Sequence, residues 1–130
     1  MHVMTVTIAM LVLFQAKHFV ADYLPQPGWV LSGKGDLRSP GGYVHAAIHA
    51  CGSLPALMIA GLGATSVVLL LGGEFVVHYL IDFTKAGLSH RSLAGPETQA
   101  YWTLHGADQL MHQMTHAGLI LAAQLVQFPV

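Results

Sequence analysis

The chain has 130 residues, of which 54% are apolar and only 8% are charged, and its formal net charge is -1. An ordinary soluble domain carries roughly 25% charged residues, so this composition is typical of a membrane protein, with one domain over residues 1–130. The near-neutral charge argues against a nucleic-acid partner, and the single cysteine excludes an intrachain disulfide.

The first apolar segment, residues 3–24, is long enough to cross a bilayer core, which needs about 20 helical residues. No basic run precedes it, so we expect a retained span and not a cleaved signal peptide. The run Pro25-Gln26-Pro27-Gly28 is expected to end this helix, because proline cannot supply the backbone donor that a helix needs. A polar connection follows over residues 29–42 and contains the expected breaker Ser39-Pro40-Gly41-Gly42.

Three further apolar segments follow at residues 43–61, 64–86 and 100–126. The turn between the second and third is so short that these two segments must form an antiparallel hairpin. We therefore expect an all-α fold, an antiparallel four-helix transmembrane bundle with both termini on the same side. Basic residues in and beside the two longer connections put those connections on the cytoplasmic side by the positive-inside rule: Lys34, Arg38, Lys85 and Arg91.

Ionisable side chains stand four residues apart in each of the four segments. On a helix this spacing puts both side chains on one face. A charged group near the centre of a span costs about 2.5–3.5 kcal/mol, so the carboxylates need partners. Because the helices alternate in direction, all four pairs fall at a similar depth, toward the cytoplasmic side. The pairs are His18 with Asp22, His45 with His49, His78 with Asp82, and Asp108 with His112.

These five imidazoles and three carboxylates are the ligand types of two divalent metal ions, with about four donors for each ion. Zinc is the first choice, and iron or manganese suit the same ligands. The alternative is a buried hydrogen-bond network in which each Asp fixes a neighbouring His and holds the helices together. Packing alone could be achieved with far fewer costly groups, so the pattern favours metal.

Three polar side chains near the pairs are candidates for catalytic or supporting roles. Glu74 lies one turn before His78 and could be a further ligand or a general base, or a packing carboxyl paired with another helix. His105 and His116 flank the last pair at helical spacing and could accept or donate protons.

The lysines and two glutamines have weaker roles in this interpretation. Lys85 could neutralise a phosphate, and Lys17 and Lys34 could likewise hold an anionic head group. The alternative for all three is extension of the side chain to the membrane interface. Gln26 and Gln109 could orient metal ligands through hydrogen bonds.

Taken together, the motifs resemble the bacterial and phage membrane family DUF3307 over nearly the whole chain. Tyr23 and Tyr79 stand where that family more often has Phe, and the polar positions are intact. The family is of unknown function, so the resemblance implies a small multi-span protein of the bacterial cytoplasmic membrane and no particular reaction. A more distant similarity to the YdjM-like membrane proteins implies, by analogy only, a metal-dependent hydrolase. The motifs are His18-x-x-x-Asp22 with Gln26, His45-x-x-x-His49, His78-x-x-x-Asp82-x-x-Lys85 and Asp108-Gln109-x-x-His112.

Four functions are consistent with such a centre. The first is a metal-dependent hydrolase of a lipid or lipid-linked ester or phosphoester, in which Glu74 or His105 moves protons and Lys85 neutralises phosphate. The second is a metal-ion carrier, which would need a homo-oligomer because four spans are few for transport. The third is a haem-binding bundle, which is less consistent with the sequence, because an Asp lies one turn from a His at three places and a carboxylate has no role beside a porphyrin. An accessory protein with a closed, structural metal site is the fourth.

Overall fold

Four long helices make up most of the protein, and no strand occurs in residues 3–24 and 26–128, the part of the chain that this computed structural model describes. The expected all-α class is confirmed for that part. Two short helices lie in the connection between the first two long ones. The elements are α1 (Val3–Tyr23), α2 (Gly28–Ser32), the 3-10 helix η1 (Gly33–Gly35), α3 (Pro40–Ile59), α4 (Ala64–Ser92) and α5 (Gln99–Gln127).

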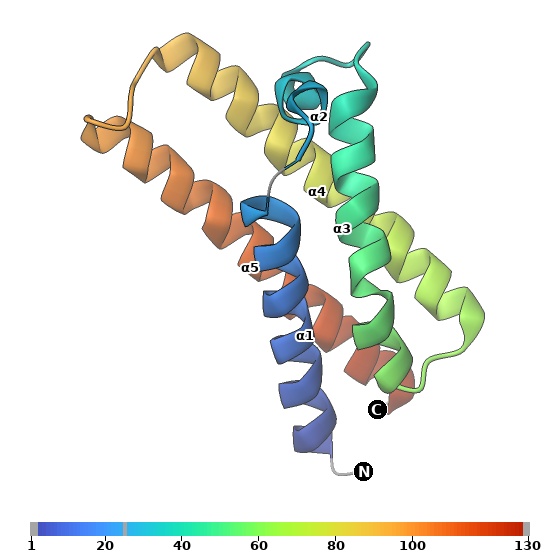
Figure 1. Cartoon of the computed structure of the whole chain (residues 1–130). Coiled ribbons are helices and arrows are strands. Elements are labelled where there is room, and N and C mark those ends of the chain that lie inside the picture. The colour runs from blue at the N-terminus through green and yellow to red at the C-terminus, as the bar shows by residue number, and fades with distance from the viewer. Residues whose placement is uncertain (1–2, 25, 129–130) are drawn as a thin grey trace.

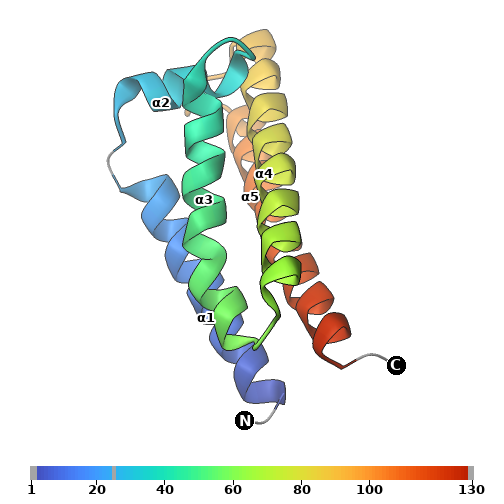
Figure 2. The ribbon, with the colours of Figure 1, turned by 90° about the vertical axis from the view of Figure 1, so that its right-hand side faces the viewer.

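The long helices pack around a common interior, with different surroundings at the two ends. Helix α3 packs against α1 and α4, and α5 packs against α4 and, less extensively, against α1 (Figure 1). The start of α1 and the end of α5 lie at one end of the molecule, which we call the terminal end (Figure 1). Helices α2 and η1 lie at the opposite end, the loop end, against α3 and α4 (Figure 2).

The start of α3 differs from the sequence-based expectation. The run at residues 39–42, expected to break a helix, begins one: Pro40 occupies the first turn, and the Ser39 hydroxyl accepts a hydrogen bond from the backbone N–H of Gly41 at 3.3 Å. Proline fits the first turn of a helix because its missing N–H would have no helical partner there. Pro55 lies inside the same helix. Pro25, expected to end α1, lies outside the described residues.

The second long connection is shorter than expected because α4 continues beyond residue 86. It ends at Ser92, and the next residue, Leu93, has the left-handed conformation with φ of 49° that often closes a helix. The polar connection expected at residues 29–42 includes η1 and most of α2.

Two glycines let η1 lie directly on the start of α3. A Cβ atom on Gly33 would stand 2.8 Å from the Cα of Gly41, and one on Gly41 would stand 2.7 Å from the carbonyl oxygen of Val30. No side chain fits at either position, so backbone meets backbone. This contact holds Lys34 of η1 beside α3 and α4.

The apolar core of the bundle lies toward the terminal end. Met10 and Phe14 of α1 are fully buried there, as are Ala56 and Leu57 of α3. Together with four residues from the other helix segments they form one contiguous group, which we call the apolar cluster: Met10, Phe14, Ala56, Leu57, Ala60, Val67, Leu119 and Ala123.

Among the described residues, two helices, α1 and α4, are long and apolar enough to cross a membrane. Most of their apolar stretch is not buried inside the protein. Helices α3 and α5 do not reach the same hydropathy, because they carry many of the polar side chains described next. Four spanning helices therefore stay a prediction.

Candidate metal centre

The eight side chains predicted to bind metal come together between the four long helices, on the loop-end side of the apolar cluster. Each long helix contributes one pair, because residues four apart share a helix face. All are buried except Asp22, which is partly buried. We call this set the polar layer: His18, Asp22, His45, His49, His78, Asp82, Asp108 and His112.

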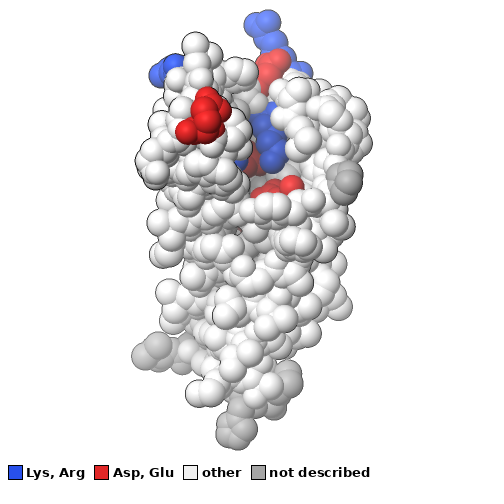
Figure 3. Space-filling model, turned by 60° about the vertical axis from the view of Figure 1, so that its left-hand side comes forward, with Lys and Arg blue, Asp and Glu red and all other residues white. Residues whose placement is uncertain are grey.

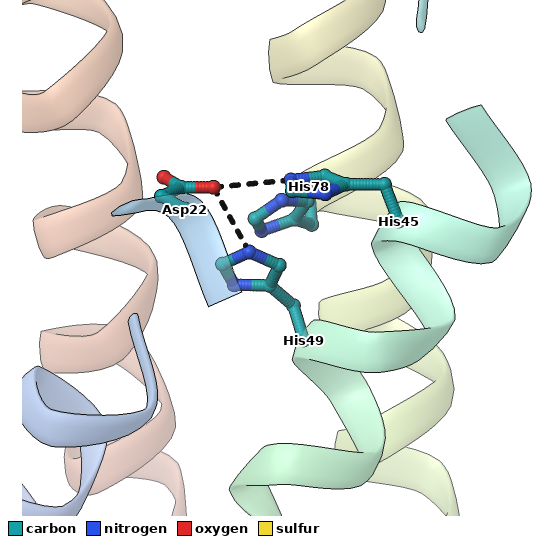
Figure 4. Close-up of side chains that lie close together, drawn as sticks. All are labelled: Asp22, His45, His49 and His78. Carbon is teal, nitrogen blue, oxygen red and sulfur yellow. Dashed lines mark hydrogen bonds and ion pairs between the residues drawn. The ribbon is translucent and has the colours of Figure 1, made fainter. Parts of the chain in front are cut away.

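Asp22 faces imidazoles from two other helices (Figure 4). Its Oδ1 lies 3.1 Å from Nε2 of His45 and 3.1 Å from Nε2 of His49. His78 completes a group of four whose ligand atoms all lie within 4.8 Å of one another. Carboxylate oxygen and neutral imidazole nitrogen are ligands of zinc and related ions. This group could therefore hold a metal ion.

A second group forms around Asp82. One ligand atom each from His78, Asp82 and His112 lie within 4.8 Å of one another. The Asp82 carboxylate is 3.4 Å from Nε2 of His112 and 3.5 Å from Nε2 of His78. It also lies 3.2 Å from Nε2 of His45, a member of the first group. Asp82 thus stands between the two groups, and His78 belongs to both.

Several nitrogen and oxygen atoms in and beside this second group, all of types that bind metal, are buried and make no hydrogen bond. Leaving a buried polar atom unpaired costs about 1–3 kcal/mol, and more for a charged group. A metal ion would satisfy nitrogen and oxygen donors of this kind together. The residues present therefore fit a metal ion. In the group these atoms are Nε2 of His78, Nε2 of His112 and Oδ2 of Asp82, which has only an ion pair with Lys34 at 3.1 Å, and Oδ1 of the neighbouring Asp108 is a fourth.

Gln26 determines that Nδ1 is a ring nitrogen of His45 that carries a proton. The oxygen of Gln26 can only accept, so Nδ1 of His45 donates to it at 3.0 Å, which in the neutral ring leaves the lone pair on Nε2. That lone pair faces the carboxylates of Asp22 and Asp82 at 3.1 and 3.2 Å. Three electron-rich atoms so close together need a positive charge between them. The Lys34 ammonium, 2.9 Å from Nε2 of His45, supplies one.

Gln109 holds the two members of the polar layer that lie outside both groups. Its side-chain oxygen accepts from Nε2 of His18 at 3.1 Å, and its amide donates to Asp108 at 3.2 Å. His18 is also 3.2 Å from Asp22. His18 and Asp108 therefore lie beside the two groups, and their role as metal ligands stays a prediction. Gln26 and Gln109 make the hydrogen bonds expected of ligand-orienting residues.

Each of the three lysines contacts a carboxylate, and none extends away from the protein as the interface interpretation required. Nζ of Lys34 lies 3.1 Å from Asp82, and Nζ of Lys85 donates to Asp108 at 3.1 Å. Lys17 pairs with a carboxylate deeper in the bundle, and only 9% of its side chain is exposed. Sequence reasoning gave Lys34 only a possible role with an anionic head group and missed its contacts with Asp82 and His45, because a separate short helix brings it to the site.

The carboxylate that pairs with Lys17 is Glu74. Glu74 is buried, accepts a hydrogen bond from the Ser53 hydroxyl at 2.8 Å, and belongs to neither ligand group. Lys17 also donates to the backbone carbonyl of His49 at 3.1 Å. This arrangement matches the alternative for Glu74, a packing carboxyl paired with another helix. Extending the four-residue spacing by one turn, from His49 to Ser53, would have found the remaining partner.

The two outer histidines have different surroundings. His105 lies toward the loop end, where its ring is parallel to that of Tyr101 with centroids 6.4 Å apart. His116 is buried and stacks on Phe14 of the apolar cluster, with ring centroids 5.1 Å apart. Of these two, only His105 is placed to meet a molecule that enters from outside.

A polar recess of about 110 Å³ opens beside the second group. Figure 3 shows lysine and acidic side chains in a hollow near one end, while most of the visible surface carries no charge. The recess brings the outside within reach of the metal ligands. It is lined by Asp22, Tyr23, Lys34, Asp82, Lys85, His105, Asp108 and Gln109.

The fold and the site define a class of protein: an all-helical bundle with buried His and Asp groups that could hold a metal ion. The chain belongs to the family described as "Protein of unknown function (DUF3307)", whose model matches residues 6–129. This confirms the family resemblance seen in the motifs. No curated protein and no solved structure matches the chain. The similarity to YdjM-like proteins stays a prediction.

Proposed function

We propose that this protein is a metal-dependent hydrolase of the membrane, and that it cleaves a lipid or lipid-linked ester or phosphoester. The observation that carries the proposal is the cluster of buried His and Asp side chains, several of whose nitrogen and oxygen atoms have no hydrogen bond, next to a recess lined by two lysines. Unpaired buried polar atoms are rare where they serve packing alone, and common at functional sites.

A membrane location is supported by the outer surface of the helices. Large apolar side chains point outward along all four, including Met4, Met58, Leu69 and Leu121, each at least 60% exposed. An apolar surface of this extent is unfavourable in water and favourable in lipid. Lys34, Arg38 and Arg91 lie in or beside the segments at the loop end, so the positive-inside rule puts that end on the cytoplasmic side.

Two ions suit the ligand set better than one. His78 belongs to both groups, so two ions would divide the donors: Asp22, His45 and His49 for one, and His78, Asp82 and His112 for the other. Asp82 could serve both, since it contacts His45 and His112. Zinc is the first choice for such nitrogen and carboxylate donors.

The chain's own groups would handle charge and protons around this centre. Such a metal pair, when bound, lowers the pKa of a coordinated water and acts as a Lewis acid. Lys34 and Lys85 line the recess and would neutralise an anionic group of the substrate. His105 lines the same recess and is the group placed to give a proton to a leaving oxygen. Gln26 and Gln109 would hold the metal ligands in position through their hydrogen bonds.

Ion transport is less consistent with this arrangement. The recess reaches the polar layer from the loop end, and beneath that layer the apolar cluster fills the interior with Met10, Phe14 and Leu57, all fully buried. A carrier needs polar groups along its path. The apolar cluster offers none.

The test is metal content and hydrolysis in one matched set of variants. Purified full-length protein in detergent is expected to contain two divalent ions per chain, measured by elemental analysis, and to release product from labelled phospholipid esters or phosphodiesters. His78→Ala should lose at least one ion and the activity, because His78 belongs to both ligand groups. His90→Ala, an exposed histidine on the same helix, is the control and should change neither.

If His78→Ala keeps its metal and its activity, the assignment is wrong. Uptake of labelled metal into sealed vesicles containing the protein would instead indicate a carrier. Far-ultraviolet circular dichroism of each variant separates loss of metal from loss of fold.

A further inference from the structure

A second, larger hollow lies between α4 and α5 and differs from the recess in character. Its volume is about 330 Å³, and apart from Thr84 and one ion pair its lining is apolar. We call it the α4–α5 groove. A pocket of this size is at the lower end of those that hold small molecules, which suits one slender apolar group. Among its lining residues are Val77, Leu80 and Leu88 of α4 and Leu104 and Met111 of α5.

The length of the groove matches one leaflet of a bilayer. From Val77 to Leu88 the helix axis advances by about 16 Å, at 1.5 Å for each residue. The hydrocarbon core of a bilayer is about 30 Å thick, so one leaflet contributes about half of that. A single acyl chain of one leaflet is therefore long enough to fill the groove.

The groove and the recess share a wall. Lys85 and Asp108 line both hollows, and their side chains bond to each other at 3.1 Å. About a third of the Lys85 side chain, 34%, is exposed. A molecule with its chain in the groove would thus have its polar end next to Lys85, with Lys34 across the recess.

The charge of the recess decides which kind of polar head group can bind there. Three carboxylates, of Asp22, Asp82 and Asp108, face the ammonium groups of Lys34 and Lys85 around the recess, so these side chains sum to one negative charge. An anion would be repelled from the bare recess. One divalent ion would change this sum to one positive charge, and a second would add two more, so an anion would then be attracted.

We propose that the α4–α5 groove and the recess together bind an anionic phospholipid, with one acyl chain in the groove and the phosphate between Lys85 and Lys34. This inference rests on the proposed function, because the metal ions make the recess positive. It adds the substrate class and the side from which the substrate enters, between α4 and α5 within the membrane.

Charge complementarity favours this occupant over a second copy of the chain. A helix packed into the groove would remove water from the partly exposed Lys85–Asp108 pair and give it no new partner, which is unfavourable. A phosphate gives Lys85 a partner of opposite charge.

The test compares a groove-filling variant with a matched control. Ala107 is exposed and lines the groove, whereas Ala117 is exposed on the same helix and lines none of the hollows described here. Metal-loaded full-length protein is titrated with phosphatidylglycerol and, separately, with phosphatidylcholine of the same chains, and bound lipid is counted by native mass spectrometry.

We expect wild type and Ala117→Phe to bind phosphatidylglycerol at least 10-fold more tightly than phosphatidylcholine. Ala107→Phe should weaken phosphatidylglycerol binding at least 10-fold with its metal content unchanged. Lys85→Gln should remove most of the preference between the two lipids. Removing the metal with a chelator should reduce phosphatidylglycerol binding to the level of phosphatidylcholine.

Each arm can overturn a different statement. Protein that contains metal but binds the two lipids equally, or Ala107→Phe that binds like wild type, overturns the lipid site and leaves the proposed function standing. Protein that takes up no metal overturns both. If light scattering shows a dimer that Ala107→Phe dissociates, the groove is an interface between copies and the lipid proposal is wrong.

Discussion

The two halves of the bundle use the same four helices for different purposes. Toward the terminal end, Met10 and Phe14 pack into the apolar cluster with no exposed surface. One and two turns further along the same helix, His18 and Asp22 belong to the polar layer, where several buried nitrogen and oxygen atoms make no hydrogen bond. The apolar half is filled by the chain's own apolar side chains. The polar half is costly unless something binds there, and this contrast is the strongest indication of function in the molecule.

The largest effect is expected at the boundary between the halves. Glu74→Ala would leave the buried Lys17 ammonium without its partner, and this should lower the free energy of unfolding by about 3–5 kcal/mol. Thermal unfolding of the full chain in detergent measures it. The double variant Lys17→Met with Glu74→Leu should recover most of that loss, because apolar groups of similar volume can replace a buried ion pair.

The same double variant tests the catalytic alternative for Glu74. A stable, metal-containing double variant that still hydrolyses lipid shows that Glu74 serves packing. Loss of activity with stability and metal intact would show that Glu74 is a general base.

The next largest effect concerns the stability of the apolar cluster alone. Phe14→Ala should lower the free energy of unfolding by about 3 kcal/mol, at the lower end of the range for buried phenylalanine, because in the proposed membrane location lipid drives apolar burial less than water does. Phe19→Ala is the control, since Phe19 is 59% exposed on the same helix. The number of metal ions per folded chain should not change in either variant. If Phe14→Ala removes metal, the two halves are not independent.

The smallest expected effect concerns the metal affinity of the polar layer. Gln26→Ala removes the acceptor that holds Nδ1 of His45, and loss of such a supporting bond typically costs 10–100-fold in metal affinity, about 1.4–2.7 kcal/mol. Competition with a chromophoric chelator measures it. Gln99→Ala, at an exposed glutamine at the start of α5, is the control. Equal affinities in the two variants would mean that His45 is not a ligand.

Much of the polar layer could be predicted because its signal is local. A spacing of four residues places both members of a pair on one helix face, and an ionisable group in an apolar segment stands out in the sequence. The convergence of the pairs followed from alternating helix directions. The extent of α4 was underestimated because residues 87–92 are polar, and hydropathy says little about where a helix ends outside an apolar environment.

The remaining features depend on contacts between distant segments. Lys34 reaches Asp82 and His45 from a separate 3-10 helix, and nothing in the sequence near Lys34 marks it as part of a site. Lys17 and Glu74 are 57 residues apart, so their pairing follows from the packing of α1 and α4 against α3. The α4–α5 groove is a matter of shape between two apolar faces, which residue types alone do not define.

The contact between Gly33 and Gly41 has a consequence for conformational entropy. Fixing a backbone residue costs about 1–2 kcal/mol, and a flexible loop that carried a lysine to an anion would lose that freedom at the moment of binding. Here η1 is already fixed against α3 when the protein folds. Lys34 has only its own side-chain freedom left to lose, about 2 kcal/mol at most.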